Sequence, residues 1–487
     1  MESMAAPLLE QDVVQFFTAQ GLLSPVQDKQ RVLSASTLSS PRTLSEGSSG
    51  GSSDRITNAS FTASTLYSPV SDIVIPDHKF SAESYQFLGF TRAKSDHLFK
   101  LFSDQMPGDD FPSSFLHIAI WEVNHPQIQD AYSPTDDWAA CIDSIGIADE
   151  LKSAIMDPRF DDVKFTASCK FWVQESVEAA YDTLCSLNED LKSRQSQIMR
   201  ARPVGRRHAG SVSSLPSQNS PSSKKLAPAG QASRDTKEQD NKSASLVDET
   251  ITQAEELGVP SHLEGHTMLW TAGVKEKLER FYDTGTRKVS LRALAMAPGD
   301  FSGQIKVAYF TPQLVTADRY AVWLKHRVQK AEIAVAQIAV PNVFIEGLSK
   351  AHLMYSDTRD GDPWKQLVWS SRRADEAYPK ALSYLYNTDL LIGHIAKGTD
   401  VPFITMDSWE AVGEQHVLIV REWTKEVSSR EGQRVEEDVL KDVRALQWVF
   451  RTTSAREEFE RVGSGKVWIH YIGRSYPVAA PVTSNTE

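Results

Sequence analysis

Two stretches of low complexity decide where this chain of 487 residues can fold. Residues 34–64 are rich in Ser, Gly and Thr, and residues 199–247 are rich in Ser, Pro and Gln. Such segments cannot bury enough apolar surface to offset the entropy of ordering, so we expect both to be disordered. The predicted organisation is a mostly disordered segment at 1–74, a folded domain at 75–198, a disordered linker at 199–247, a second folded domain at 248–475 and a disordered tail at 476–487.

The composition limits the classes of protein to consider. Hydrophobic residues make up 40% and charged residues 24% of the chain, which are values typical of globular proteins. The formal net charge of -12 argues against broad nucleic-acid binding. No apolar run approaches the ~20 residues that cross a bilayer, so no membrane partner is expected. The 3 cysteines lack metal-binding spacing, which predicts reduced thiols, no metal cofactor and a cytoplasmic or nuclear location.

A short amphipathic helix is predicted at about residues 8–22. Leu9, Val13 and Phe17 recur at helical spacing, and Gly21 can end the helix. A helix this short is marginal in water by itself. It therefore needs a partner, which is either the folded body of this chain or another protein.

The first folded part, residues 75–198, gives a fold class but no function. The apolar run at 115–123 predicts a strand, Asp137 can cap a following helix, and apolar residues from Val177 to Leu191 predict a long helix. The sequence of this part shows no pair of nucleophile and base, no phosphate-binding loop and no metal cluster. It is therefore predicted only to be an α+β domain.

The second folded part contains a predicted strand–turn–helix corner. Residues 306–311 alternate and end in strand-forming side chains, and Pro312 cannot donate a ladder hydrogen bond. Thr316 can then cap a helix. Because Tyr309 and Thr311 are two residues apart in a strand, we expect both on the same face.

Other elements of this part follow from periodicity and turn residues, and together they predict an α+β domain with small antiparallel sheets. The predicted strands are 332–341, 389–395, 416–420 and 466–472, and the predicted helices are 317–328, 363–370, 435–449 and 454–461.

Three motifs occur in a fixed order in the second part. They are Phe281-Tyr282-Asp283-Thr284-Gly285-Thr286, then Tyr309-Phe310-Thr311 followed by Ala317, Tyr320 and Ala321, and then Asp389-Leu390-Leu391-Ile392-Gly393-His394-Ile395-Ala396 followed by Gln415. Taken together, over roughly residues 255 to 425, they resemble the mono-ADP-ribosyltransferase-like superfamily. The branch they resemble has an F-[HY]-G-T opening, a Y-x-T middle, a D-x-x-I-G-x-[IV]-A strand and a late Gln. The resemblance implies a split antiparallel-sheet fold of the ADP-ribosyltransferase type, with NAD as the substrate.

The resemblance also implies roles for single residues. Five are expected to hold NAD, with Tyr309 as an aromatic wall against nicotinamide: Tyr282, Thr284, Tyr309, Thr311 and His394. Gln415 and Glu414 are the expected catalytic residues at the ribose. If both lie on a strand, their side chains face opposite sides, and only one enters the cleft. Asp389 and Gly393 are expected to be mainly structural.

Two features leave the activity open. A Gln is neutral and can only form hydrogen bonds, which favours hydrolysis of NAD or weak transfer over efficient modification of arginine. Asp283 stands where the family has Gly, and a carboxylate near a pyrophosphate would repel it. The chain is therefore expected either to transfer ADP-ribose to a macromolecule or hydrolyse NAD, or to be an inactive relative that binds a protein partner. In a third interpretation, the motifs are only core structure of an unrelated α+β fold.

Overall fold

The computed structural model describes residues 6–34, 37, 72–104, 114–201, 262–296, 299–303, 305–356, 362–373, 378–430 and 433–472. The chain divides into two compact units, Met1–Gln195 with His262–Glu487, and Ser196–Ser261. Residues 196–201, the described part of the second unit, are the end of helix α8 (Cys169–Ala201). Apart from Ser34, Thr37 and 199–201, the segments predicted to be disordered at 34–64, 199–247 and 476–487 lie outside the described residues.

The predicted N-terminal helix is confirmed as α1 (Gln11–Ala19), which buries Val13 and Phe17. Strand β1 (Gln30–Leu33) follows and pairs antiparallel with β2 (Ile73–Pro76). The backbone N–H of Glu10 donates to Oδ1 of Asn188 on α8 at 2.9 Å, and Lys192 forms an ion pair with the Glu10 carboxylate. The partner of this short helix is therefore the folded body of its own chain.

The part predicted as the first domain is helical in its described residues beyond β2. Its elements are α2 (Ala82–Phe87), α3 (Arg92–Asp104), α4 (Phe115–Val123), α5 (Trp138–Ile145), α6 (Asp149–Ile155), η3 (Pro158–Phe160), α7 (Asp161–Lys164) and α8. The prediction of a strand at 115–123 was wrong, because these residues form helix α4. Oγ of Ser114 accepts a hydrogen bond from the His117 N–H at 3.1 Å and so caps its first turn. A continuous apolar run has no alternation that separates a strand from a helix.

Two sheets organise the rest of the described chain. One has the order β13-β7-β3 and is antiparallel, with β3 (His266–Val274), β7 (Ile333–Pro341) and β13 (Val467–Tyr471). The other has the order β6-β12-β9-β8, with β6 (Tyr309–Phe310), β8 (Lys350–Leu353), β9 (Leu390–His394) and β12 (Leu446–Phe450). Its β8–β9 pair is parallel and its other pairs are antiparallel. The sheets meet where Trp270 and Thr311 exchange backbone hydrogen bonds of 2.8 and 2.9 Å.

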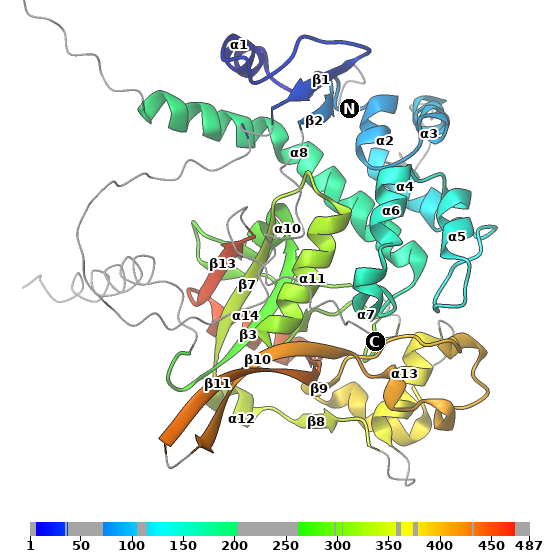
Figure 1. Ribbon diagram of the computed structural model, residues 1–487, viewed down its shortest axis with the longest axis vertical. Coiled ribbons are helices and arrows are strands. Elements are labelled where there is room, and N and C mark those ends of the chain that lie inside the picture. Colours follow the sequence, from blue (N-terminus) through cyan, green and yellow to red (C-terminus); the bar gives the residue numbers. More distant parts are fainter. Residues whose placement is uncertain are drawn as a thin grey trace, which may run out of the picture. The chain divides into compact units, whose positions relative to one another are not determined.

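Two hairpins and several helices complete this part. The hairpins are β4 (Tyr282–Asp283) with β5 (Lys288–Val289), and β10 (Ile419–Arg430) with β11 (Gln433–Arg444). The helices are α10 (Lys275–Phe281), α11 (Leu314–Arg327), α12 (Asn342–Gly347), α13 (Pro363–Arg372) and α14 (Thr453–Gly463), with 3-10 turns η4 (Leu291–Leu294), η5 (Lys380–Asn387), η6 (Phe403–Thr405), η7 (Trp409–Ala411) and η8 (Glu414–His416). Helix α11 lies against β3 and β7 (Figure 1). The described residues therefore form a mixed α+β structure with small sheets.

Several predicted elements of the second part are confirmed, and others were wrong. The strands at 332–341, 389–395 and 466–472 and the helices at 317–328, 363–370 and 454–461 are present, with ends shifted by a few residues. The helix predicted at 435–449 was wrong, because this range covers most of β11 and most of β12. Its apolar residues recur at helical spacing, but each of residues 433–444 has a ladder partner in β10. The strand predicted at 416–420 is the end of η8 and the start of β10.

The predicted corner is only partly correct. Of residues 306–311, Tyr309 and Phe310 form β6, while Val307 makes a single bridge to Met296 and Thr311 makes one to Trp270 of β3. Helix α11 begins at Leu314, so Thr316 lies inside its first turn and is not the cap. Its hydroxyl donates to the side-chain oxygen of Gln313 at 3.1 Å.

Strand β7 separates two hydrophobic clusters. Ile333 and Val335 belong to the cluster that contains the helical part, while Ala334 and Ile338 belong to the cluster around α10 and α14. The first cluster joins both halves of the chain across the predicted domain boundary. The two folded parts, predicted as separate domains, therefore share one core within one compact unit.

Trp323 on α11 is central to this shared core. It is fully buried, with its ring centroid 5.0 Å from that of Phe160 and 5.9 Å from that of Trp172. We predict that Trp323→Ala lowers the free energy of unfolding by about 3–5 kcal/mol, because a large cavity is left between the two halves. Urea denaturation followed by circular dichroism measures this change.

The control for this prediction is Trp121→Ala, since Trp121 is 53% exposed. We expect that substitution to change the free energy of unfolding by less than about 0.5 kcal/mol. Separate unfolding transitions for the two halves, or an equally small effect at Trp323, would contradict the shared core.

Candidate functional site

A cavity of about 170 Å³ lies where the two halves of the chain meet. Its walls come from the segment before α8 and the start of that helix, from β3, β6, α11 and β12, and from side chains of neighbouring loops and α13. The lining is mainly aromatic and aliphatic, with hydroxyl groups and two ion pairs among it. The aromatic side chains are Phe171, Trp172, Trp270, Tyr309, Phe310 and Tyr320, and the hydroxyl-bearing threonines are Thr166, Thr271, Thr311 and Thr316.

Strand register places three polar side chains of this lining on one face. Tyr309 of β6 pairs with Val449 of β12, so these two share a face of the sheet. Thr311 lies two residues beyond Tyr309, and Gln447 lies two residues before Val449, so both face the same way. Tyr309, Thr311 and Gln447 all line the cavity.

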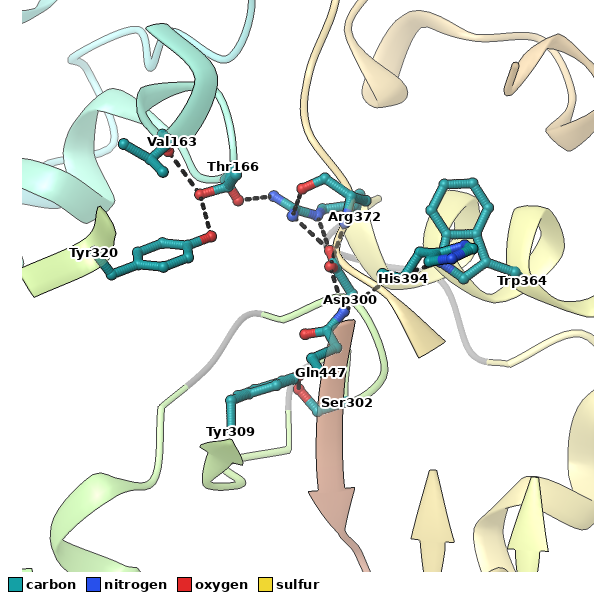
Figure 2. A network of polar contacts seen from close by, with 11 residues as sticks. Val163, Thr166, Asp300, Ser302, Tyr309, Tyr320, Trp364, Arg372, His394 and Gln447 are labelled. Atoms are coloured by element: carbon teal, nitrogen blue, oxygen red, sulfur yellow. Dashed lines mark hydrogen bonds and ion pairs between the residues drawn. The ribbon is translucent and has the colours of Figure 1, made fainter. Parts of the chain in front are cut away.

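The amide of Gln447 is held at its nitrogen. Nε2 donates to Oδ2 of Asp300 at 2.7 Å and to the backbone oxygen of His394 at 3.1 Å. Figure 2 shows the nitrogen directed at Asp300 and the side-chain oxygen directed away from it. The amide oxygen is thus the free end of this side chain.

The carboxylate of Asp300 is buried and fully hydrogen-bonded. Its Oδ1 accepts from Nε of Arg372 at 2.7 Å and lies 2.5 Å from the second guanidinium nitrogen of that side chain. Its Oδ2 accepts from the backbone N–H of Ala396 at 2.8 Å as well as from Gln447. Arg372 also donates to the backbone oxygen of Thr166 at 2.5 Å, which ties this cluster to the helical half (Figure 2).

The side chain of Tyr309 lines the cavity and is held in place by its neighbours. Its hydroxyl donates to Oγ of Ser302 at 3.0 Å (Figure 2), and burial raises the pKa of this phenol, so it stays protonated. Gly299 packs against it so closely that a Cβ there would lie 2.0 Å from the Tyr309 hydroxyl oxygen. Any larger residue at position 299 would move the tyrosine.

A second ion pair marks another part of the cavity lining. Arg327 donates to Oε2 of Glu175 at 2.5 Å and to Oγ of Ser176 at 2.7 Å. Its guanidinium lies 4.7 Å from the Trp172 ring and 4.8 Å from the Trp323 ring, and burial lowers its pKa. The two halves of the chain are therefore joined beside the cavity by a charge pair whose arginine is buried.

The cavity extends along α11, and its charges are compensated. On α11 the lining runs from Thr316 to Arg327, which at helical rise is roughly 16 Å. Among the described lining residues the cations are Arg327 and Arg372, and each is paired with a carboxylate. A phosphate would find no uncompensated charge here.

The volume fits one ring with its substituents. Cavities of about 150 Å³ hold a single benzene ring, and pockets for drug-sized molecules run from about 300 Å³ upward. The aromatic wall, the Thr311 hydroxyl and the free oxygen of Gln447 can bind an uncharged, flat group through stacking and hydrogen bonds.

Only two of the seven site residues expected from the sequence line this cavity, Tyr309 and Thr311. Tyr282 is buried in the cluster around α10 and α14, where burial raises its pKa. Thr284 is exposed in the turn between β4 and β5. Asp283 holds that turn, because its Oδ1 accepts from the backbone N–H groups of Gly285 and Thr286 at 2.8 and 3.0 Å.

The other three expected residues also lie outside the lining. His394 is buried in β9, where Nδ1 accepts from the Tyr355 N–H at 2.9 Å. Glu414 forms an ion pair with Arg444, and Gln415 beside it is exposed. Both lie on η8, so the expectation that they alternate along a strand was wrong.

The two structural roles expected in the third motif are confirmed. Asp389 accepts hydrogen bonds from the Ser349 and Thr452 hydroxyls at 2.8 and 2.6 Å, and so ties two loops to the start of β9. Gly393 allows close approach of β8, since a Cβ there would lie 2.1 Å from the Leu353 backbone oxygen.

Gln447 and Asp300 are two polar groups of the cavity that were not predicted as site residues from the sequence. Gln447 stands in an apolar run, Leu446-Gln447-Trp448-Val449-Phe450, where a single polar residue in a buried strand indicates a function or a partner. Assigning residues 435–449 to a helix hid this signal. The partners of Asp300 lie 72, 96 and 147 residues away in the sequence, so its near neighbours do not reveal these contacts.

Within the described ranges, no group of three or more His, Cys, Asp or Glu residues is arranged to hold a metal ion. None of the described helices is both long enough and apolar enough to cross a membrane. Comparison of the chain with models of known protein families, with curated proteins and with solved structures found no match.

The buried imidazole of His394 leads to a prediction about how stability depends on pH. Burial, with a smaller contribution from the charge of Arg444, lowers the pKa of His394 from 6.5 to about 4. Between these values the unfolded chain binds a proton that the folded chain does not. We predict that His394 makes the free energy of unfolding fall by up to about 1.4 kcal/mol per pH unit as the pH drops from 6.5 toward 4.

The matched variant is His394→Asn, whose side-chain oxygen can still accept from the Tyr355 N–H but does not titrate. Urea denaturation at a series of pH values should give a shallower loss of stability for this variant over that window. An identical pH dependence in both proteins would rule out His394 as the titrating group.

Proposed function

We propose that the second folded part of the chain has a fold of the ADP-ribosyltransferase type that binds NAD, and that the cavity between it and the helical part takes the nicotinamide–ribose end of NAD. The observation that carries this proposal is the meeting of Tyr309, Thr311 and the Gln447 amide at one cavity. The resemblance assigns an aromatic wall and a late Gln to this role. We assign that role to Gln447, which lines the cavity, in place of Gln415.

The chemistry follows from these side chains. Breaking the bond between nicotinamide and ribose forms a centre resembling an oxocarbenium ion. The Tyr309 ring can hold the leaving nicotinamide, and the oxygen of Gln447 can accept a hydrogen bond from a ribose hydroxyl. A neutral amide does not take up a proton, so the reaction needs an acceptor that reacts without a strong base. Water can be this acceptor: its oxygen bonds to the ribose carbon as the bond to nicotinamide breaks, and its proton is released, which gives nicotinamide and ADP-ribose.

The remainder of NAD has to lie outside the cavity. A volume of about 170 Å³ is too small for a dinucleotide, and the paired arginines do not attract its phosphates. The ADP-ribosyltransferase type of fold is supported by two small sheets that meet at Trp270 and Thr311, directly beside the cavity.

A second candidate is an inactive relative that binds without reaction. It is favoured by the carboxylates of the cavity, because Asp300 and Glu175 are both engaged by arginines. Each carboxylate is already paired with a cation, so neither is available to stabilise a positively charged reaction centre.

Calorimetric titration of the full chain with NAD, together with an assay of nicotinamide release, tests both candidates. We predict that Tyr309→Ala and Gln447→Ala weaken NAD binding about tenfold or more, since each removes a stacking or hydrogen-bonding partner worth about 1–2 kcal/mol. Gln415→Ala is the matched control and should bind as the wild type does.

Release of nicotinamide supports hydrolysis, and binding without release supports the inactive relative. The absence of NAD binding in the wild-type chain would overturn the proposal. A loss of binding in Gln415→Ala, with none in Gln447→Ala, would overturn the assignment of the amide.

A further inference from the structure

The orientation of the Gln447 amide is determined by its surroundings. Nε2 faces two hydrogen-bond acceptors, the Asp300 carboxylate and the His394 backbone oxygen. Turning the amide over would place its oxygen against both and leave no hydrogen bond on that side. A carboxylate has no hydrogen to donate, so only one orientation is compatible with an ionised Asp300.

Asp300 in turn has little freedom to move. It is 3% exposed, and besides Gln447 it accepts from Arg372 and from the backbone of Ala396. Arg372 is itself anchored to the Thr166 backbone oxygen in the helical half. The chain of contacts in Figure 2 therefore fixes the amide from behind, through groups that come from distant parts of the sequence.

We infer that Asp300 is a positioning residue that keeps the Gln447 carbonyl oxygen toward the cavity, so that the site selects uncharged flat ligands carrying a hydrogen-bond donor. The donor is an amide N–H or a hydroxyl, and a ligand that offers only acceptors is rejected. This inference rests on the proposed function, which places the ligand in the cavity, and adds the chemical group that the ligand must carry. It concerns the donor chemistry of the ligand and applies to ligands other than NAD.

The selectivity has a simple physical origin. A ligand acceptor placed against the Gln447 oxygen leaves a buried acceptor without a partner and brings two oxygens together. A ligand donor satisfies the same oxygen. The Thr311 hydroxyl accepts from the Gln313 N–H at 3.1 Å, so its own hydrogen is left to donate to a ligand carbonyl.

Benzamide and acetophenone form a matched pair of probes for this test. Both are neutral single rings with a carbonyl group, but benzamide has an NH₂ group where acetophenone has a methyl group. Dissociation constants are measured on the full chain by titration with ligand-observed NMR. We expect the wild-type chain to bind benzamide about tenfold or more tightly than acetophenone.

Variants separate positioning from general stability. In Asp300→Asn the new amide can form a hydrogen bond with either orientation of the Gln447 amide. The ratio of the dissociation constants of acetophenone and benzamide should therefore fall toward one. Gln447→Met removes the oxygen and should have the same effect if Asp300→Asn does not fold. Asp389→Asn is the control, because Asp389 holds the loops at Ser349 and Thr452 and does not line the cavity. Its preference should equal that of the wild type.

A wild-type chain that binds both probes equally, or neither, would overturn the inference. So would a full preference for benzamide in Asp300→Asn or Gln447→Met. Failure of the proposed function looks different, since benzamide would be preferred while NAD does not bind. If NAD binds and the two probes are not distinguished, the proposed function stands and this inference fails.

Discussion

The carboxylate of Asp300 joins four separate parts of the chain at a buried point: its own loop before β6, the end of α13, the second residue after β9 and strand β12. Burying a charge is costly unless a partner and hydrogen bonds compensate it, and here four contacts do so. Removing one partner of such a pair typically costs about 3–5 kcal/mol. The placement of Arg372, of the Gln447 amide and of the cavity wall all depends on this group.

The same cluster connects the two halves of the molecule. Arg372 reaches the Thr166 backbone, Tyr320 donates to the Thr166 hydroxyl at 3.1 Å, and Arg319 pairs with Asp162 at 2.7 Å. The helical half thus forms one wall of the cavity, in addition to sharing its core with the sheets.

The sequence predicted the fold better than the site, for physical reasons. Elements with a strong local pattern, such as β7, β9, α11 and α14, could be recognised because periodicity and turn residues are local signals. Residues 115–123 and 435–449 were misassigned because apolar spacing there suits both a helix and a strand. Tyr309 and Thr311 could be placed together because they are two residues apart in one short segment. Gln447 and Asp300 depend on strand register and on contacts over more than 70 residues, which no local pattern encodes.

The most direct test of ligand binding at this cavity is a crystal structure of the full chain, determined from crystals soaked with nicotinamide or NAD. We predict that the nicotinamide ring lies against the face of Tyr309, with a ligand donor within hydrogen-bond distance of the Gln447 side-chain oxygen. Density for the ring at Tyr282 or Gln415, or an unchanged cavity at a ligand concentration that saturates binding in solution, would contradict it.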